Sequence, residues 1–212
     1  MNEVTKKEVF ELQNGEFKLD SFQDQLNFAN LLIQKRLVSE TFKEPAQLVI
    51  AIQACKSLGL NPITGLKMFY VVGGKPALYG DGPLSLIQSS GKLDSLEEFF
   101  IDDKGEKICL ENKNLNAEVF GAVCRMKRKG DPTTQEDFFT EVDRKNAMLN
   151  SPVWSKYKRN MMRYRVRAMC AKSKFADVLN GLEIAEYTYS DLPSEGEINN
   201  DKSKLTELNE KF

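Results

Sequence analysis

The sequence predicts a fold of the α+β class, with helical runs toward both ends of the chain and strand-like runs between them. Three patterns carry this prediction: helical runs within residues 21–58, a hairpin pattern over residues 67–79 and one long helical run over residues 151–182. The chain has 212 residues, of which 41% are hydrophobic, so it can form one domain with a sizeable core.

The first part of the chain is predicted to be a polar arm followed by two helices. Residues 1–20 are polar, with a turn signal at Asn14-Gly15, and we expect this arm to be mobile. The first helix should run over residues 21–39, capped by Asp20 or Ser21, and the second over residues 44–58. Neither helix has a charge pattern that indicates chemistry, so we interpret both as packing or self-association elements.

The middle of the chain is predicted to begin with a β-hairpin. Two β-rich runs, Lys67–Val72 and Lys75–Tyr79, are joined by Gly73-Gly74, and Pro76 favours an edge position for the second run. Further elements should follow in this order: a short helix over residues 84–90, a strand over 96–101, a short run over 107–110, a strand over 117–128 and a short helix over 142–149.

The long helical run should start at Ser151-Pro152 and stop at Gly181, because no Pro or Gly interrupts it. At about 100° per residue, one arc should face the core; it comprises Tyr157, Met161, Tyr164, Ala168, Ala171, Phe175 and Leu179. Two basic stripes flank this arc, namely Lys156, Arg163, Arg167 and Lys174 on one side and Lys158, Arg165 and Lys172 on the other. Met162, Val166 and Met169 form an apolar strip on the back.

This helix lies in a strongly basic stretch of a nearly neutral chain, whose net charge is −1. Residues 144–176 contain ten basic residues and no acidic one. Charged helix faces are usually just solvated, but ordinary faces mix Glu with Lys because pairs four residues apart stabilise a helix. Like charges without counter-charges destabilise it, and a polyanion such as a phosphate backbone would relieve that cost.

Composition excludes several classes of function. The chain has no His, which removes His-based nucleophile pairs, His metal ligands and the usual neutral-pH general base. Its four Cys are far apart, as in a reduced cytosolic protein. With no apolar run near 18 residues and no signal-peptide pattern, we expect a cytoplasmic protein without membrane contact. The acids at 97, 98, 102 and 103 favour a solvated turn over a metal site.

The basic helix also resembles a known family. Trp154, Lys158-Arg159, Met161-Met162-Arg163, Arg165, Cys170-Ala171-Lys172 and Phe175 form a pattern similar to the C-terminal core helix of the RecT/Redβ family of phage-type single-strand DNA annealing proteins. The start Ser151-Pro152-Val153-Trp154 matches members of that group, and Phe139-Thr140 with Asp143 resembles the segment before the helix. The resemblance is best over residues 136–182 and weaker over 45–91. Arg167 and Lys174 depart from the family pattern, which has apolar residues there.

The resemblance implies an α+β fold, a small antiparallel sheet with helices packed on it. It also implies a binding protein, not an enzyme, which anneals single-stranded DNA in homologous recombination without ATP, cofactor, metal or catalytic residues. Its partners would be single-stranded DNA, the annealed duplex and further copies of itself in a ring or helical filament. The resemblance maps the family's DNA-contacting positions best onto Arg159, Arg165 and Lys172. Two of these lie on the stripe of Lys158, Arg165 and Lys172, which favours that stripe over the other. The full set of predicted DNA-binding residues is Lys158, Arg159, Arg163, Arg165, Lys172, Lys75 and Tyr79. Arg163 could instead contact a neighbouring subunit or a core carboxylate.

Two other functions stay open from the residues alone. One is a metal-dependent nuclease that uses carboxylates and holds its substrate with the basic helix. The other is a phage assembly protein whose basic helix binds an acidic partner.

The end of the chain differs in character, with nine acids and three lysines in residues 177–212. We therefore expect a DNA-binding core over residues 1–182 and an acidic, flexible tail over 183–212. The tail is short beside family members with a partner-binding domain, so binding of a phage exonuclease or a host single-strand-binding protein is left open.

Overall fold

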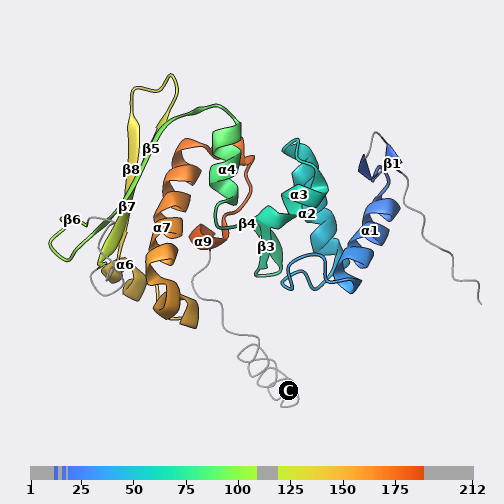
Figure 1. Ribbon diagram of the computed structural model, residues 1–212, viewed down its shortest axis with the longest axis horizontal. Coiled ribbons are helices and arrows are strands. Elements are labelled where there is room, and N and C mark those ends of the chain that lie inside the picture. Colours follow the sequence, from blue (N-terminus) through green and yellow to red (C-terminus); the bar gives the residue numbers. More distant parts are fainter. Residues whose placement is uncertain (1–11, 14–15, 18, 109–118, 189–212) are drawn as a thin grey trace, which may run out of the picture.

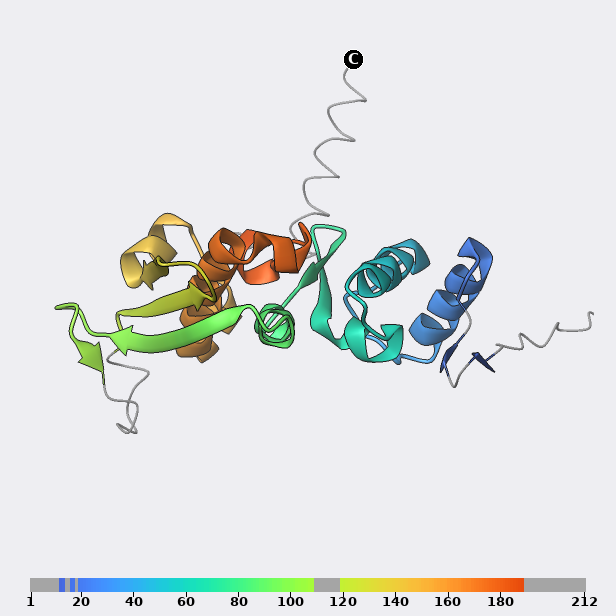
Figure 2. The same cartoon turned by 90° about the horizontal axis from the view of Figure 1, so that it is seen from above.

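The structure, a computed structural model, describes residues 12–13, 16–17, 19–108 and 119–188. The molecule is elongated, with a helical part formed by the N-terminal residues and a sheet with its helices formed by the later ones (Figures 1 and 2). The predicted α+β class is confirmed. None of the helices in the described ranges is both long and apolar enough to cross a membrane.

Both predicted N-terminal helices are present. They are α1 (Phe22–Gln34) and α2 (Pro45–Ser57), and they pack against each other. The Ser21 side chain caps α1 by accepting a hydrogen bond from the Asp24 amide, which confirms Ser21 as the cap. Two short strands, β1 (Leu12–Gln13) and β2 (Glu16–Phe17), precede α1. The predicted turn at residues 14–15 lies outside the described residues.

The predicted hairpin consists of β3 (Phe69–Val72) and β4 (Lys75–Leu78). Gly73 and Gly74 both have positive φ, 57° and 78°, which suits the two-residue turn between twisted antiparallel strands. Two short helices, α3 (Pro62–Gly65) and η1 (Leu66–Met68), lie between α2 and this hairpin. After the hairpin, α4 (Gly82–Ser89) starts two residues earlier than predicted.

A four-stranded antiparallel sheet follows, in the order β6-β5-β7-β8. Its strands are β5 (Leu93–Ile101), β6 (Lys107–Ile108), β7 (Gly121–Arg128) and β8 (Thr134–Thr140). Sequence patterns missed β8, because it is an edge strand in which Phe139 is the one buried residue, so no apolar alternation marks it. The ends of two predicted strands, residues 109–110 and 117–118, lie outside the described residues.

Four helices complete the fold: α6 (Glu141–Asn146), α7 (Pro152–Lys174), α8 (Ala176–Leu179) and α9 (Ala185–Thr188). The prediction that the long helix continues to Gly181 was wrong, since Phe175 leaves the helical region at φ −128° and ψ 29°. A second break lies at Tyr157, with φ −129° and ψ 33°. The Phe175 ring is fully buried, so the break is stabilised by core packing.

The predicted core arc of this helix is only partly correct. Ala168, Ala171, Phe175 and Leu179 are buried as expected, but Tyr157 is 59% exposed. Met162 and Val166, assigned to the back of the helix, are fully buried. The reason is that α7 contacts the sheet through β7 and β8 and also packs against α4, α8 and α9, so more than one face is covered.

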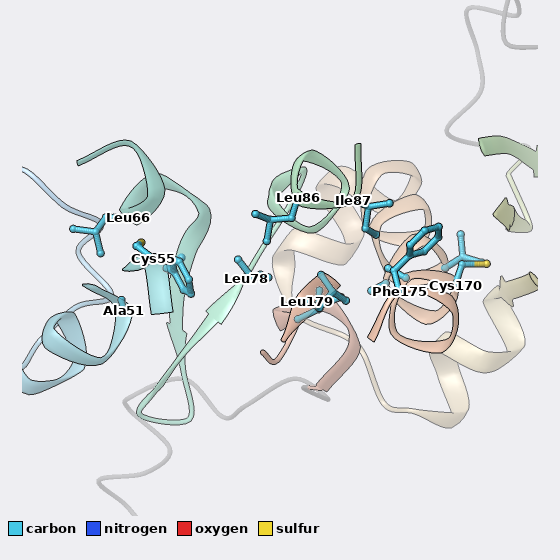
Figure 3. Close-up of a cluster of buried hydrophobic side chains, with 14 of the residues drawn as sticks. Ala51, Cys55, Leu66, Leu78, Leu86, Ile87, Cys170, Phe175 and Leu179 are labelled. Carbon is cyan, nitrogen blue, oxygen red and sulfur yellow. The ribbon is translucent and has the colours of Figure 1, made fainter. Parts of the chain in front are cut away.

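One continuous core joins the two parts of the molecule. Leu78 of β4 lies between side chains of α2 and η1, such as Cys55 and Leu66, and side chains of α4 and α8, such as Leu86 and Leu179 (Figure 3). The backbone amide of Leu78 donates to the Glu183 carbonyl at 2.8 Å, and Leu78 forms a parallel bridge with Ile184, which is 1% exposed. The buried core therefore reaches Ile184, two residues beyond the predicted limit at residue 182.

Candidate nucleic-acid interface

Arg167 shows that the basic residues of α7 do not all face solvent. It is 5% exposed, and its guanidinium donates to both carboxylate oxygens of Glu98 at 2.6 Å and to Asp81. Burial by itself would lower the pKa of Arg167, but the carboxylates of Glu98 and Asp81 outweigh it and hold that pKa above its usual value. Arg167 is therefore a structural ion-pair residue that ties α7 to β5 and to the residue preceding α4.

Arg165 and Lys172, which lie on the stripe favoured by the family resemblance, are engaged by the C-terminal segment. Arg165 donates to the carbonyl oxygens of Glu186 and Tyr187, the latter at 2.7 Å, and burial lowers its pKa. Lys172 forms an ion pair with Glu183 at 2.9 Å, and its Nζ lies 4.5 Å from the centre of the Tyr187 ring. Both cations thus have partners within the fold.

Two further cations, Lys158 of the same stripe and Lys174 of the other stripe, also form ion pairs. Lys158 lies 3.1 Å from Glu141, and Lys174 lies 2.6 Å from Asp131. The hydrogen bond from Arg144, supported by Lys158, lowers the pKa of the Glu141 carboxyl to about 2 against the opposing effect of burial. Every residue of the Lys158, Arg165 and Lys172 stripe therefore has an intramolecular partner.

Three other cations of α7 form neither an ion pair nor a side-chain hydrogen bond among the described residues: Lys156, Arg159 and Arg163. They follow one face of the N-terminal half of α7 and line, with Tyr157 and Asn160, a shallow polar pocket of about 200 Å³. We call this set the α7 cation cluster.

Aromatic rings and burial hold the two arginines of the cluster in place. Arg159 stacks over the Phe100 ring at 4.9 Å, and Arg163 lies over the Tyr164 ring at 5.3 Å. The Arg163 Nε is buried and has no hydrogen-bond acceptor within the described part of the chain. The cluster therefore presents positive charge that is already oriented and that no carboxylate of the described residues neutralises.

The other two predicted contact residues lie on the β3–β4 hairpin. Lys75 is exposed and forms no ion pair within the described residues, and Tyr79, directly after β4, is 38% exposed. Its ring lies 5.2 Å from that of Tyr70, which is 40% exposed. Sequence analysis missed Tyr70, although its place opposite Ala77 in the predicted hairpin could have indicated that it neighbours Tyr79.

The acidic residues near β5 do not converge on one point. Glu97 pairs with Lys107 at 2.9 Å and Arg125 at 3.1 Å, and these hydrogen bonds lower its pKa, whereas Glu98 pairs with Arg167. Successive strand residues point to opposite faces of a sheet, which explains the separation. Over the described ranges, no three Cys, Asp or Glu side chains are grouped so as to hold a metal ion.

The structure is that of an α+β protein whose core helix α7 presents cations that are unpaired among the described residues, and whose β3–β4 hairpin carries exposed aromatic rings. Clustered cations of this kind are typical of polyanion-binding proteins. Comparison with protein families matches residues 26–204 to the RecT family, so the chain belongs to the RecT family. This is a family of phage-type recombination and single-strand annealing proteins, not of catalysts. Comparison with curated proteins finds no match.

Proposed function

We propose that this protein binds single-stranded DNA through the α7 cation cluster and anneals it to a complementary strand without ATP. The observation that carries the proposal is that Lys156, Arg159 and Arg163 are the α7 cations whose side chains form neither an ion pair nor a hydrogen bond within the described structure. The basic stretch contains no acid of its own, so a bound phosphate backbone supplies the missing counter-charge.

The spacing of the cluster suits a backbone contact. Residues 159 and 163 both follow the break at Tyr157 and are four positions apart on a helix, which corresponds to a separation of about 6 Å along its axis. Contacts with phosphates fix the position of a strand but leave its base edges free. A strand held in this way can pair with its complement, so specificity comes from base pairing and no base-reading side chain is required.

We extend the proposed contact surface to the hairpin. Tyr79, with Tyr70 beside it, offers exposed ring surface on which bases can stack, and such stacking is worth about 1–3 kcal/mol per base. Lys75 supplies a further phosphate contact from the same hairpin. Arg165, Lys172 and Lys158 could contact DNA only after exchanging their present partners, so we assign them a secondary role.

Annealing of long strands requires many copies side by side. We therefore propose a homo-oligomer, a ring or helical filament, that binds single-stranded DNA and holds the annealed duplex, with no nucleotide or metal cofactor.

The test compares charge removal inside and outside the cluster. Arg159→Ala, Arg163→Ala and the double variant are assayed for single-strand binding by gel shift and for annealing of complementary oligonucleotides without ATP. If each charged hydrogen bond contributes about 1.5–3 kcal/mol, each single variant should lose at least about tenfold in affinity. Lys104→Ala, which removes an exposed cation at the β5–β6 turn, is the matched control and should behave like the parent.

Three outcomes would contradict the proposal. Parent-like annealing by the double variant would show that the cluster does not hold the strand. Magnesium-dependent cleavage of the same DNA would favour a nuclease. No affinity for DNA at low salt would favour an assembly protein.

A further inference from the structure

An apolar groove lies in the N-terminal part of the molecule. It has a volume of about 520 Å³ and is lined by side chains of β2, α1, the residues after α1, α3, η1 and β3, and by Tyr79 after β4. Two of its lining residues, Leu37 and Ile63, are 67% and 42% exposed. Apolar side chains exposed around a concave surface indicate a contact site for another protein surface.

The charge at this groove is positive. Lys67 is the charged side chain among the described lining residues, and Arg36 directly precedes the lining residue Leu37. Both are exposed, and within the described ranges neither forms an ion pair. The groove therefore suits an apolar group that is accompanied by carboxylates.

Such a group is present on another face of the same chain, at the edge strand β8. A hollow of about 760 Å³ between β8, α6, α7 and α9 is lined by Glu136, Asp137 and Asp143, and also by Phe138 and Tyr187. Phe138 is 62% exposed and Tyr187 is 41% exposed. We call these five residues the β8 patch. Arg165 also lines the hollow, where it donates to two backbone carbonyls. Glu136 forms an ion pair with Arg125, so Asp137 and Asp143 are the lining carboxylates without an ion pair among the described residues.

The two surfaces lie on different parts of the elongated molecule. β8 and α6 are at the end remote from α1, with the hairpin and α4 between them (Figures 1 and 2). A groove and a patch so placed cannot meet within one chain, but they can meet between two copies. An interface between two different surfaces is heterologous, so it repeats from copy to copy and builds rings or helical filaments.

We propose that the groove of one copy receives the β8 patch of the next copy, with Phe138 seated beside Leu37 and Ile63. The carboxylates of Asp137 and Asp143 then face Lys67 and Arg36 across the contact. The inference rests on the proposed function, because it specifies how the copies that share a DNA strand are joined.

The experiment uses one variant of each surface, both with an exposed apolar residue changed to Glu. Leu37→Glu disables the groove and leaves the patch intact, and Phe138→Glu does the reverse. Molecular mass is measured by light scattering for the full chain without DNA. The parent should form assemblies larger than a dimer, and each variant alone should be monomeric. An equimolar mixture should form a dimer and nothing larger, because the intact groove of Phe138→Glu can bind the intact patch of Leu37→Glu and no other intact pair of surfaces remains.

Phe22→Glu is the matched control, since Phe22 is 67% exposed on α1 but does not line the groove. It should assemble like the parent. The inference is overturned if the parent is monomeric, if either variant keeps the parent's mass, or if the mixture stays monomeric. Dimers of Phe138→Glu alone would show that groove meets groove.

The experiments distinguish failure of this subunit interface from failure of the proposed DNA contact. Both variants keep the α7 cation cluster, so they should bind a short single-stranded oligonucleotide as well as the parent does. If assembly responds as expected but Arg159→Ala and Arg163→Ala anneal normally, the interface is correct and the proposed DNA contact fails. If the cluster variants lose DNA binding while Leu37→Glu assembles normally, the interface fails instead.

Discussion

Arg167 lies on the same α7 stripe as Lys156 and Arg163, yet its guanidinium is buried between two carboxylates. The Glu98 side chain is 17% exposed, so both members of this pair have lost most of their hydration. The Asp81 side chain is 70% exposed and contributes less, because solvent screens its charge. Single residues of one charge run thus have different roles, set by what the fold brings next to them.

Removing one partner of the Arg167–Glu98 ion pair should strongly destabilise the fold. Arg167→Met leaves a largely buried carboxylate without its partner, and we expect the free energy of unfolding to fall by about 3–5 kcal/mol. Urea denaturation measures this. The double variant Arg167→Met with Glu98→Leu should recover part of the loss. A loss below about 1 kcal/mol in the single variant would show that Glu98 stays hydrated.

The lowered pKa of Glu141 predicts that the folded protein loses part of its stability in acid. The pKa of this carboxyl is lowered to about 2 in the folded state by Arg144 and Lys158, against about 4.3 in an unfolded chain. The folded state therefore binds this proton less readily, so the contribution of Glu141 is present above about pH 4.3 and is lost as the pH falls toward 2.

The check is the melting temperature of the parent and of Glu141→Gln between neutral pH and pH 2. The substitution should lower the melting temperature at neutral pH and have little effect at the acid end. Glu40→Gln, at an exposed glutamate without an ion pair in the described structure, is the control. An equal difference between parent and Glu141→Gln at every pH would contradict the assignment.

At the scale of elements, the segment after α8 is part of the core. Ile184 bridges to β4, the Glu186 carboxylate accepts from the Gly80 amide at 2.7 Å, and carbonyls of the same segment hold Arg165. Burial raises the pKa of Glu186, opposed by the Gly80 hydrogen bond. This segment connects the hairpin to α7 and takes up cations that would otherwise be free.

Two truncations test the importance of this segment. A chain that ends at Leu182 lacks the segment, whereas a chain that ends at Thr188 retains it. The shorter chain loses the buried Ile184 side chain, a change that alone costs about 2–5 kcal/mol. Its melting temperature should be several degrees lower, by about 2–4 °C per kcal/mol. Equal melting temperatures would show that the segment is not required for the fold.

At the scale of the whole molecule, the net charge of −1 means that the proposed attraction to DNA has to come from a local surface. Affinity for single-stranded DNA should therefore fall linearly with salt on logarithmic axes, with a slope of about 0.7 per phosphate neutralised. Arg159→Ala and Arg163→Ala should each reduce the slope by about 0.7, the contribution of one phosphate contact. Fluorescence anisotropy from about 50 to 200 mM salt measures it, and a slope unchanged from the parent in both variants would contradict direct contact.

Much of this protein follows from local sequence patterns. The capped helix α1, the Gly73-Gly74 hairpin, the basic helix and the family motif are all local, because helix and turn preferences act over a few residues. The polar edge strand β8 and the break at Phe175 did not follow, since pairing with β7 and core packing decide them.

Only the tertiary structure decided which basic residues are free. The sequence by itself determined that α7 is basic and that its charges form two stripes. It could not show that Arg167 meets Glu98 and Asp81, which are 69 and 86 residues away, or that Lys172 meets Glu183. Helical periodicity gives the direction of a side chain on its own helix, but the counter-charge it meets comes from other elements, and those are placed by the packing of the whole chain.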